Sequence, residues 1–177
     1  GSFMKIVNKH NVVLKIDLIL GLPFETISTY FEGLELFLPY FKNTDHVLNI
    51  HRLQILPGSE LEGLVNEYGI NYSKDAPHIV FSTSNMTVSE LNFASKLTAI
   101  LFRVLNSPLR KQFFETKERA GGTFLELIKN IFESMSILKN DFKNIKIVKN
   151  EFVDDRYWND EIFKEIPSEW IFNYLKN

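Results

Sequence analysis

Two stretches near the start of the chain alternate apolar and polar side chains. Residues 12–20 place leucine and isoleucine at every second position, and residues 47–55 repeat the alternation with Leu48 and Ile50. A period of two is typical of β-strands. The segment between them has apolar residues at helical spacing from Ile27 to Leu38, and Pro39 is expected to end that helix. A helix between two strands at this distance predicts a right-handed parallel βαβ unit.

Three capping boxes predict helix starts further along the chain: Ser59–Glu62, Thr87–Glu90 and Thr123–Glu126. The helix after Ser59 is expected to stop near Gly69, and residues 71–85 read as a loop with a short extended piece at 78–81. The helix after Thr87 carries an apolar stripe, and Ser107-Pro108 starts another helix that Gly121-Gly122 should break. The stripe consists of Leu91, Ala94, Leu97, Leu101 and Val104.

Residues 139–151 are rich in Lys and Asn, with a weak strand signal at 145–148. The aromatic tail, with Tyr157, Trp158, Trp170 and Tyr174, is expected to pack back as short helices. The predicted fold class is α/β. Residues 1–86 would supply the βα units of a partial (β/α) barrel, and residues 87–177 a mainly helical C-terminal domain.

Composition and charge argue against proteins that bind nucleic acid or span a membrane. The chain has 177 residues, 45% hydrophobic residues, a net charge of −2 and no cysteine. Such a charge gives no strong attraction to nucleic acid or anionic lipid. The apolar runs are also shorter than the roughly 20 residues that span a bilayer. These features predict a cytoplasmic globular protein with neither a membrane nor a nucleic-acid partner.

The polar positions of the two strands give the candidate site. If the apolar set faces outer helices, Lys15, Asp17, Ile19 and Gly21 face the inside of a barrel, together with Asn49 and His51. Active sites of such barrels lie at the carboxyl ends of the strands. Lys15, Asp17, Asn49 and His51 are therefore candidates to line one cavity. A plain ion pair between Lys15 and Asp17 is the structural alternative.

Two motifs resemble one family. Asp17-x-Ile19-x-Gly21-Leu22-Pro23-x-Glu25-Thr26, followed by Leu53-x-x-Leu56-Pro57-Gly58-Ser59-x-Leu61, is similar to the fifth and sixth barrel strands of radical S-adenosylmethionine enzymes. Members with an N-terminal cobalamin-binding domain are the most similar, and Glu67-Tyr68-Gly69 also matches their pattern. The resemblance covers residues 10–90. Phe24 stands where the family usually has glycine.

The resemblance implies that Ile19 and Gly21 lie near the adenine of S-adenosylmethionine, while Glu25 and Thr26 secure the turn and the helix start. The parent enzyme would use S-adenosylmethionine and a [4Fe-4S] cluster, with cobalamin as a further candidate. Cluster iron needs thiolate ligands, and this chain has no cysteine to supply them. We therefore expect a C-terminal part of a radical oxidoreductase or methyltransferase that is inactive alone and holds no cofactor itself.

Its expected partners are the N-terminal half of the barrel or a second copy that pairs with the exposed edge of the first strand. The alternative function is a helical docking module for a protein or substrate, without catalysis, formed by residues 87–177.

Other patterns are weaker. The four histidines lack metal-ligand spacing, so no metal site is expected. Gly121-Gly122-Thr123 is more typical of a helix break than of an anion site. Solvated helix faces best explain the basic cluster of Arg103, Arg110, Lys111, Lys117 and Arg119, and binding of nucleic acid or an acidic partner protein is the alternative.

Overall fold

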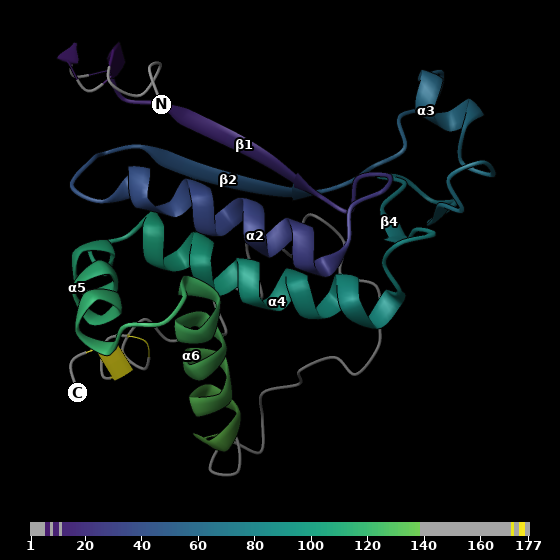
Figure 1. Ribbon diagram of the computed structural model, residues 1–177. Helices are drawn as coiled ribbons and strands as arrows, with labels where there is room; N and C mark the ends of the chain where they lie inside the picture. Colours follow the sequence, from purple (N-terminus) through teal and green to yellow (C-terminus); the bar gives the residue numbers. More distant parts are fainter. Residues whose placement is uncertain (1–5, 8, 11, 139–170, 172–173, 176–177) are drawn as a thin grey trace.

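The computed structural model describes residues 6–7, 9–10, 12–138, 171 and 174–175. Along the chain the elements are β1 (Lys15–Leu20), α2 (Ile27–Phe37), the 3₁₀ helix η1 (Leu38–Phe41), β2 (Val47–Arg52), α3 (Glu60–Gly63), β3 (Asn71–Tyr72), β4 (Val80–Ser82), α4 (Val88–Leu105), α5 (Arg110–Ala120) and α6 (Phe124–Leu138). Helices α2 and α4 lie on one side of the β1–β2 pair (Figure 1).

Strands β1 and β2 form the predicted parallel pair, with Asp17 opposite Asn49 and Ile19 opposite His51. Helix α2 connects them. Its N-cap is Thr26, which exchanges hydrogen bonds with Thr29 in a capping box that ends the turn after β1. Pro39 ends the α-helical part as expected, and the chain continues as the 3₁₀ helix η1. Both strands are shorter than predicted, because the regular pairing runs only from residue 15 and only to residue 52.

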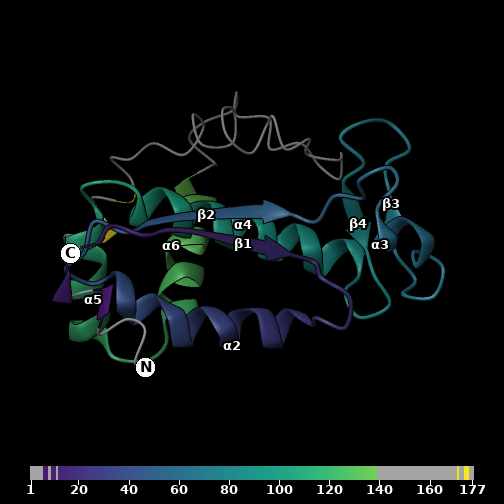
Figure 2. The same cartoon turned by 90° about the horizontal axis from the view of Figure 1, so that it is seen from above.

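A small antiparallel sheet lies beyond the carboxyl ends of β1 and β2 (Figure 2). Strand β3 pairs with β4, and a bridge between Gln54 and Ile79 joins the chain after β2 to the same layer. The predicted helix after Ser59 is wrong in length. Ser59 does cap it, but α3 ends at Gly63 and residues 64–69 are turns that lead to Gly69 at positive φ. Gly63, a weak helix former, is the local reason for the early end.

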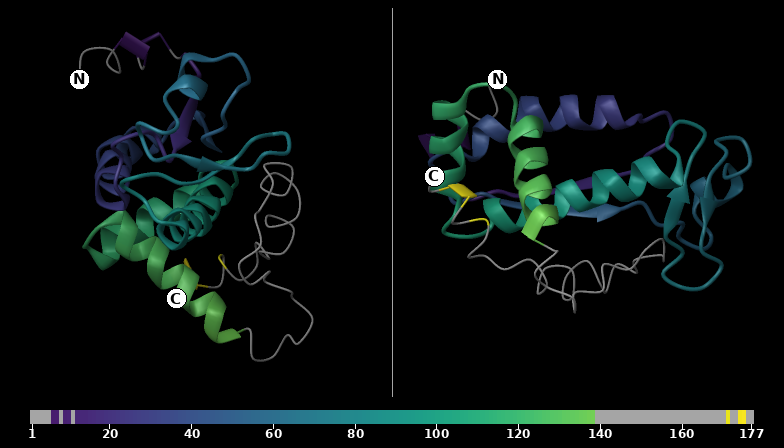
Figure 3. Two further views of the ribbon diagram at one scale, coloured as in Figure 1. Left: turned by 90° about the vertical axis from the view of Figure 1, so that its right-hand side faces the viewer. Right: turned by 90° about the horizontal axis from the view of Figure 1, so that it is seen from below.

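The helical part follows the sequence prediction closely. Thr87 and Glu90 form a capping box at the start of α4, and the side chains of its predicted apolar stripe are all buried. Thr123 and Glu126 hydrogen-bond each other's backbone N–H in the same way at α6. Helix α5 ends at Gly121, which has a positive φ of 71°. Helix α5 lies at the opposite end of the molecule from β3 and β4 (Figure 3).

One cluster of buried side chains joins the sheet to the helices. Leu20 and Leu48 from the strands, Leu97 from α4, Phe113 from α5 and Ile131 from α6 belong to it. Ile171 and Leu175 are also buried in this core. The predicted segments 1–86 and 87–177 therefore share a core.

The mixed α/β class, with a two-stranded parallel sheet followed by helices, is confirmed. Among the described residues, no helix combines the length and apolarity needed to cross a membrane. The strand signal at 145–148 and the aromatic residues 157, 158 and 170 lie outside the described residues. Tyr174 lies inside them and packs against the core.

Candidate functional site

The two faces of the β1–β2 pair have opposite character. On the face toward the helices, Leu20, Leu48 and Ile50 are buried. On the other face, Lys15, Asp17, Ile19 and His51 are exposed and Asn49 is half-buried. The expected alternation is therefore present in both strands. It brings five of the six predicted site residues to one face.

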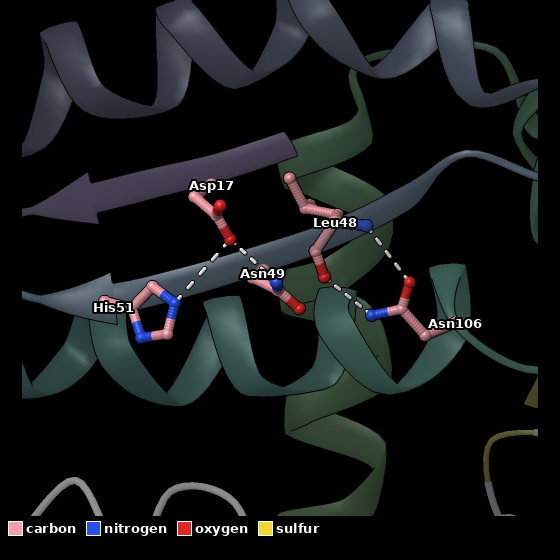
Figure 4. A network of polar contacts seen from close by, with 5 residues as sticks. All are labelled: Asp17, Leu48, Asn49, His51 and Asn106. Atoms are coloured by element: carbon pink, nitrogen blue, oxygen red, sulfur yellow. Dashed lines mark hydrogen bonds and ion pairs between the residues drawn. The ribbon is translucent and has the colours of Figure 1, made fainter. Parts of the chain in front are cut away.

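Asp17 is the centre of a polar network on this face (Figure 4). Asn49 Nδ2 donates a hydrogen bond of 2.7 Å to Asp17 Oδ1. The same oxygen lies 3.8 Å from His51 Nε2. The parallel register explains the arrangement, because it sets Asn49 directly beside Asp17. His51 lies two residues further along β2, so its side chain is on the same face as that of Asn49. In the described part of the chain no ion pair joins Lys15 to Asp17.

The network can hold a carboxylate in a fixed orientation next to an imidazole. Asn49 restrains the Asp17 carboxylate, and His51 keeps its Nδ1 atom free of the Asp17 contact, which involves Nε2. About half of the Asp17 and His51 side-chain surfaces is exposed, at 57% and 52%. The pair is thus accessible, and it could accept or donate a proton or hydrogen-bond a polar ligand.

Gly21 occupies a different environment from the other five. It is buried, and a Cβ on it would lie 3.0 Å from Leu91 Cδ2 of α4. Its φ of +92° also favours glycine. Its N–H donates to Glu25 Oε2 over 2.8 Å. A ligand contact at Gly21 would therefore use its carbonyl oxygen or Cα, whereas Ile19 presents an exposed side chain beside the network.

Glu25 locks the turn between β1 and α2. Its Oε2 accepts hydrogen bonds from the N–H groups of Gly21 and Leu22, the second at 3.3 Å. Partial burial raises the pKa of the Glu25 carboxyl, although these two donors act in the opposite direction. The carboxylate therefore secures the turn itself, and Thr26 and Thr29 cap the helix.

Exposed apolar side chains occur in the loops that follow the strands. Leu22 and Phe24 are exposed in the β1–α2 loop, and Leu56 is exposed after β2. Phe24 has a positive φ of 67° and packs edge-on against Tyr68, with ring centroids 5.2 Å apart. Phe24 therefore adopts the left-handed backbone conformation that glycine favours.

Sequence reasoning missed two residues that contact the outer edge of β2. Asn106, the C-cap of α4, accepts a hydrogen bond from Leu48 N at 3.1 Å and donates one to Leu48 O at 2.7 Å. Arg110 donates to the backbone oxygens of Leu105, Thr44 and His46. An asparagine before Ser-Pro predicts only a helix end, and nothing in the sequence indicates its distant partner.

His46 lies buried just before β2. Its Nδ1 accepts a hydrogen bond of 3.3 Å from Leu14 N, so the neutral ring carries its proton on Nε2. Burial lowers the pKa of His46, and the charge of Arg110 lowers it further, whereas Asp45 acts in the opposite direction. His46 thus belongs to the packing between β1 and β2, away from the Asp17 network.

The solvated-face interpretation of the basic cluster fits Lys111, whose side chain is 82% exposed, and is wrong for Arg110, which is half-buried. Lys117 lies over the Phe124 ring, and Arg119 donates to the Leu175 oxygen. Within the described residues no group of three or more acidic or histidine side chains could hold a metal ion.

The chain matches no protein-family profile, and no curated protein is significantly similar to it. The site's chemistry is that of an accessible carboxylate, amide and imidazole beside an exposed isoleucine, on the face of the parallel strand pair that no described helix covers.

Proposed function

We propose that this chain is the substrate-side part of the barrel of a radical S-adenosylmethionine oxidoreductase or methyltransferase, and that it is inactive alone. Lys15, Asp17, Asn49 and His51 would face the substrate inside the barrel. Ile19 and Gly21 would lie near the adenine of S-adenosylmethionine. The remainder of the barrel, with its three-cysteine loop, would be the partner.

The observation that carries the proposal is the asymmetry of the β1–β2 pair. Parallel strands normally have both faces covered, and in a barrel one face meets the outer helices while the other faces the interior. Here α2 and α4 cover one face, and the other carries the polar network around Asp17. A polar face without a covering helix, as found among the described elements, is what two neighbouring strands of a barrel wall would present.

The turn after β1 adds support. Its Gly-Leu-Pro sequence is held by the Glu25 carboxylate, and Gly21 packs closely against Leu91. This fixes the β1 carboxyl end, where a cofactor in a barrel of this kind would lie. Ile19 could then pack its exposed side chain against a planar ring.

The residues present do not fit an iron–sulfur cluster, because the chain has no cysteine. The cluster and its chemistry would therefore belong to another segment of the parent protein. The role of this chain would be to position the substrate: Asn49 would restrain Asp17, and Asp17 and His51 would hydrogen-bond the substrate or exchange a proton with it.

The reading frame upstream of Phe3 tests this proposal first. A Cys-x-x-x-Cys-x-x-Cys loop roughly one hundred or more residues before Asp17, the length that four preceding βα units need, would support it. An upstream sequence without such a loop would overturn it.

A second test uses the complete protein, reconstituted with its cluster. Asp17→Ala or His51→Ala should lower substrate conversion by about 10²-fold while cleavage of S-adenosylmethionine persists, because these side chains would act on the substrate. Lys74→Ala, an exposed change in the loop after β3, is the control and should leave both reactions unchanged. If the Asp17 and His51 variants retain both reactions, the assigned roles are contradicted.

The docking-module function remains a prediction. Among the side chains that the structure describes, the large exposed apolar ones lie at Val88 or before it, and none lies on α5 or on residues 124–134 of α6. A helical docking surface would need such side chains. The barrel function therefore has the stronger support.

A further inference from the structure

The two edges of the β1–β2 pair differ in what hydrogen-bonds their outward backbone groups. In the parallel ladder, Val47 N donates to Leu14 O at 2.8 Å and Leu53 N donates to Leu20 O at 2.9 Å. The backbone groups of these odd-numbered residues face β1, so those of Leu48 must point away from it. Leu48 therefore lies on the outer edge of β2, where a further strand would pair.

Asn106 makes the two hydrogen bonds that such a strand would make. Its amide oxygen accepts from Leu48 N at 3.1 Å, and its amide nitrogen donates to Leu48 O at 2.7 Å (Figure 4). A side-chain amide has the same donor and acceptor groups as a peptide unit. Asn106 thus satisfies both outward groups of Leu48 from the end of α4.

Arg110 extends the contact toward the start of β2. Its Nη2 donates to His46 O at 2.8 Å, and its Nη1 donates to Thr44 O. His46 O lies two residues before Leu48 and also points away from β1. Together, Asn106 and Arg110 occupy the edge from residue 44 to residue 48. On the opposite side, β1 has no strand partner other than β2 in the described part of the chain.

We propose that Asn106 and Arg110 form an edge cap that ends the sheet at β2 and prevents a strand of another polypeptide from pairing there. Open strand edges promote association between chains, and proteins commonly block them. The cap uses the junction between α4 and α5, so the helical segment protects the sheet as well as packing beneath it. This inference does not depend on the proposed function.

The test is the variant Asn106→Leu, which has a similar volume and cannot make the two hydrogen bonds. Loss of one net hydrogen bond corresponds to about a tenfold change in local opening. We expect the Leu48 amide to exchange about tenfold faster than in the parent chain, measured by hydrogen exchange. We also expect stronger self-association than the parent chain, measured by sedimentation velocity over a range of concentrations. Asn106→Leu combined with Arg110→Met should associate further.

The matched control is Asn130→Leu, the same substitution at an exposed position of α6, which should leave both measurements unchanged. If Asn106→Leu does not fold, Asn106→Asp serves instead, because aspartate keeps an acceptor for Leu48 N but loses the donor to Leu48 O. A uniform loss of hydrogen-exchange protection across the core, without added self-association, would overturn the proposal. Asn106 would then only hold α4 against β2. An unchanged Leu48 amide would overturn it as well.

Discussion

The two faces of the β1–β2 pair place similar secondary structure in opposite surroundings. Toward the helices, Leu20 and Leu48 are almost completely inaccessible, and even polar residues such as His46 and Arg52 are buried. On the other face, Asp17 and His51 keep about half of their side-chain surface exposed. The helix-facing side therefore stabilises the fold, whereas the polar side contributes little that folding requires. Side chains that folding does not need are available for binding or chemistry.

The largest effect on stability is expected from shortening a side chain on the buried face. Leu48→Ala should lower the free energy of unfolding by about 2–5 kcal/mol, because it removes buried apolar surface and leaves a cavity. Urea denaturation measures it. Leu36→Ala on α2 is the control, since this leucine is 78% exposed, and it should cost less than about 0.5 kcal/mol. Equal effects of the two variants would contradict the assignment of the buried face.

A substitution in the turn that ends β1 is expected to have the next largest effect on stability. Gly21→Ala should destabilise the fold by about 1–2 kcal/mol, because alanine is strained at positive φ and its methyl group would crowd Leu91. Gly33→Ala in α2 is the matched control. A methyl group added at Gly33 would have no neighbour within 4 Å, so this change should stabilise the helix by up to about 1 kcal/mol. Thermal unfolding of both variants should shift in opposite directions, and a shift in the same direction would refute the tight approach at Gly21.

His46 makes the buried face sensitive to acid. Because its pKa is lowered in the folded state, the unfolded chain binds the proton more readily, and stability rises with pH in this range. The contribution is complete above the ordinary value of 6.5 and is lost as pH falls below it. The slope should reach at most about 1.4 kcal/mol per pH unit. His46→Gln, which keeps an acceptor for Leu14 N without titrating, should flatten the stability profile between about pH 7 and pH 5. An unchanged slope would count against this role.

The smallest effects belong to the polar face. Asn49→Ala and Asp17→Asn should each change the free energy of unfolding by less than about 0.5 kcal/mol, because half-exposed polar contacts contribute little. Chemical denaturation of the two variants beside Leu48→Ala checks the contrast directly. A loss above about 2 kcal/mol in either variant, the size expected for a buried structural contact, would remove the argument that these residues are available for function.

Local patterns predicted much of the fold. The alternation from Leu14 to Leu20 identified both the strand and its buried face, and Thr87 with Glu90 located the start of α4. These signals succeed because the interactions involved join residues only a few positions apart. The candidate polar set was also predictable, since it followed from the alternation of side chains in two strands whose parallel direction the strand–helix–strand order predicted. The prediction for Gly21 was incomplete, because its position against Leu91 depends on how α4 packs.

Long-range side-chain contacts could not be predicted in the same way. Arg110 looked like one member of a basic cluster, yet it binds backbone oxygens 64 and 66 positions earlier in the chain. Helix α3 was predicted too long because its capping box gives the start of a helix and not its end. The contacts of Arg110 depend on tertiary packing, whereas the early end of α3 has a local reason in the weak helix former Gly63.

The contact between Asn106 and Leu48 has a consequence for the order of folding. The two residues are 58 positions apart, so β2 is synthesised well before the side chain that satisfies its outer edge. Until the end of α4 becomes available, the outward N–H and C=O groups of Leu48 can hydrogen-bond only water or another strand. We therefore expect wrong strand pairing at this edge to be favoured until Asn106 reaches Leu48, and rapid formation of α4 to shorten that period.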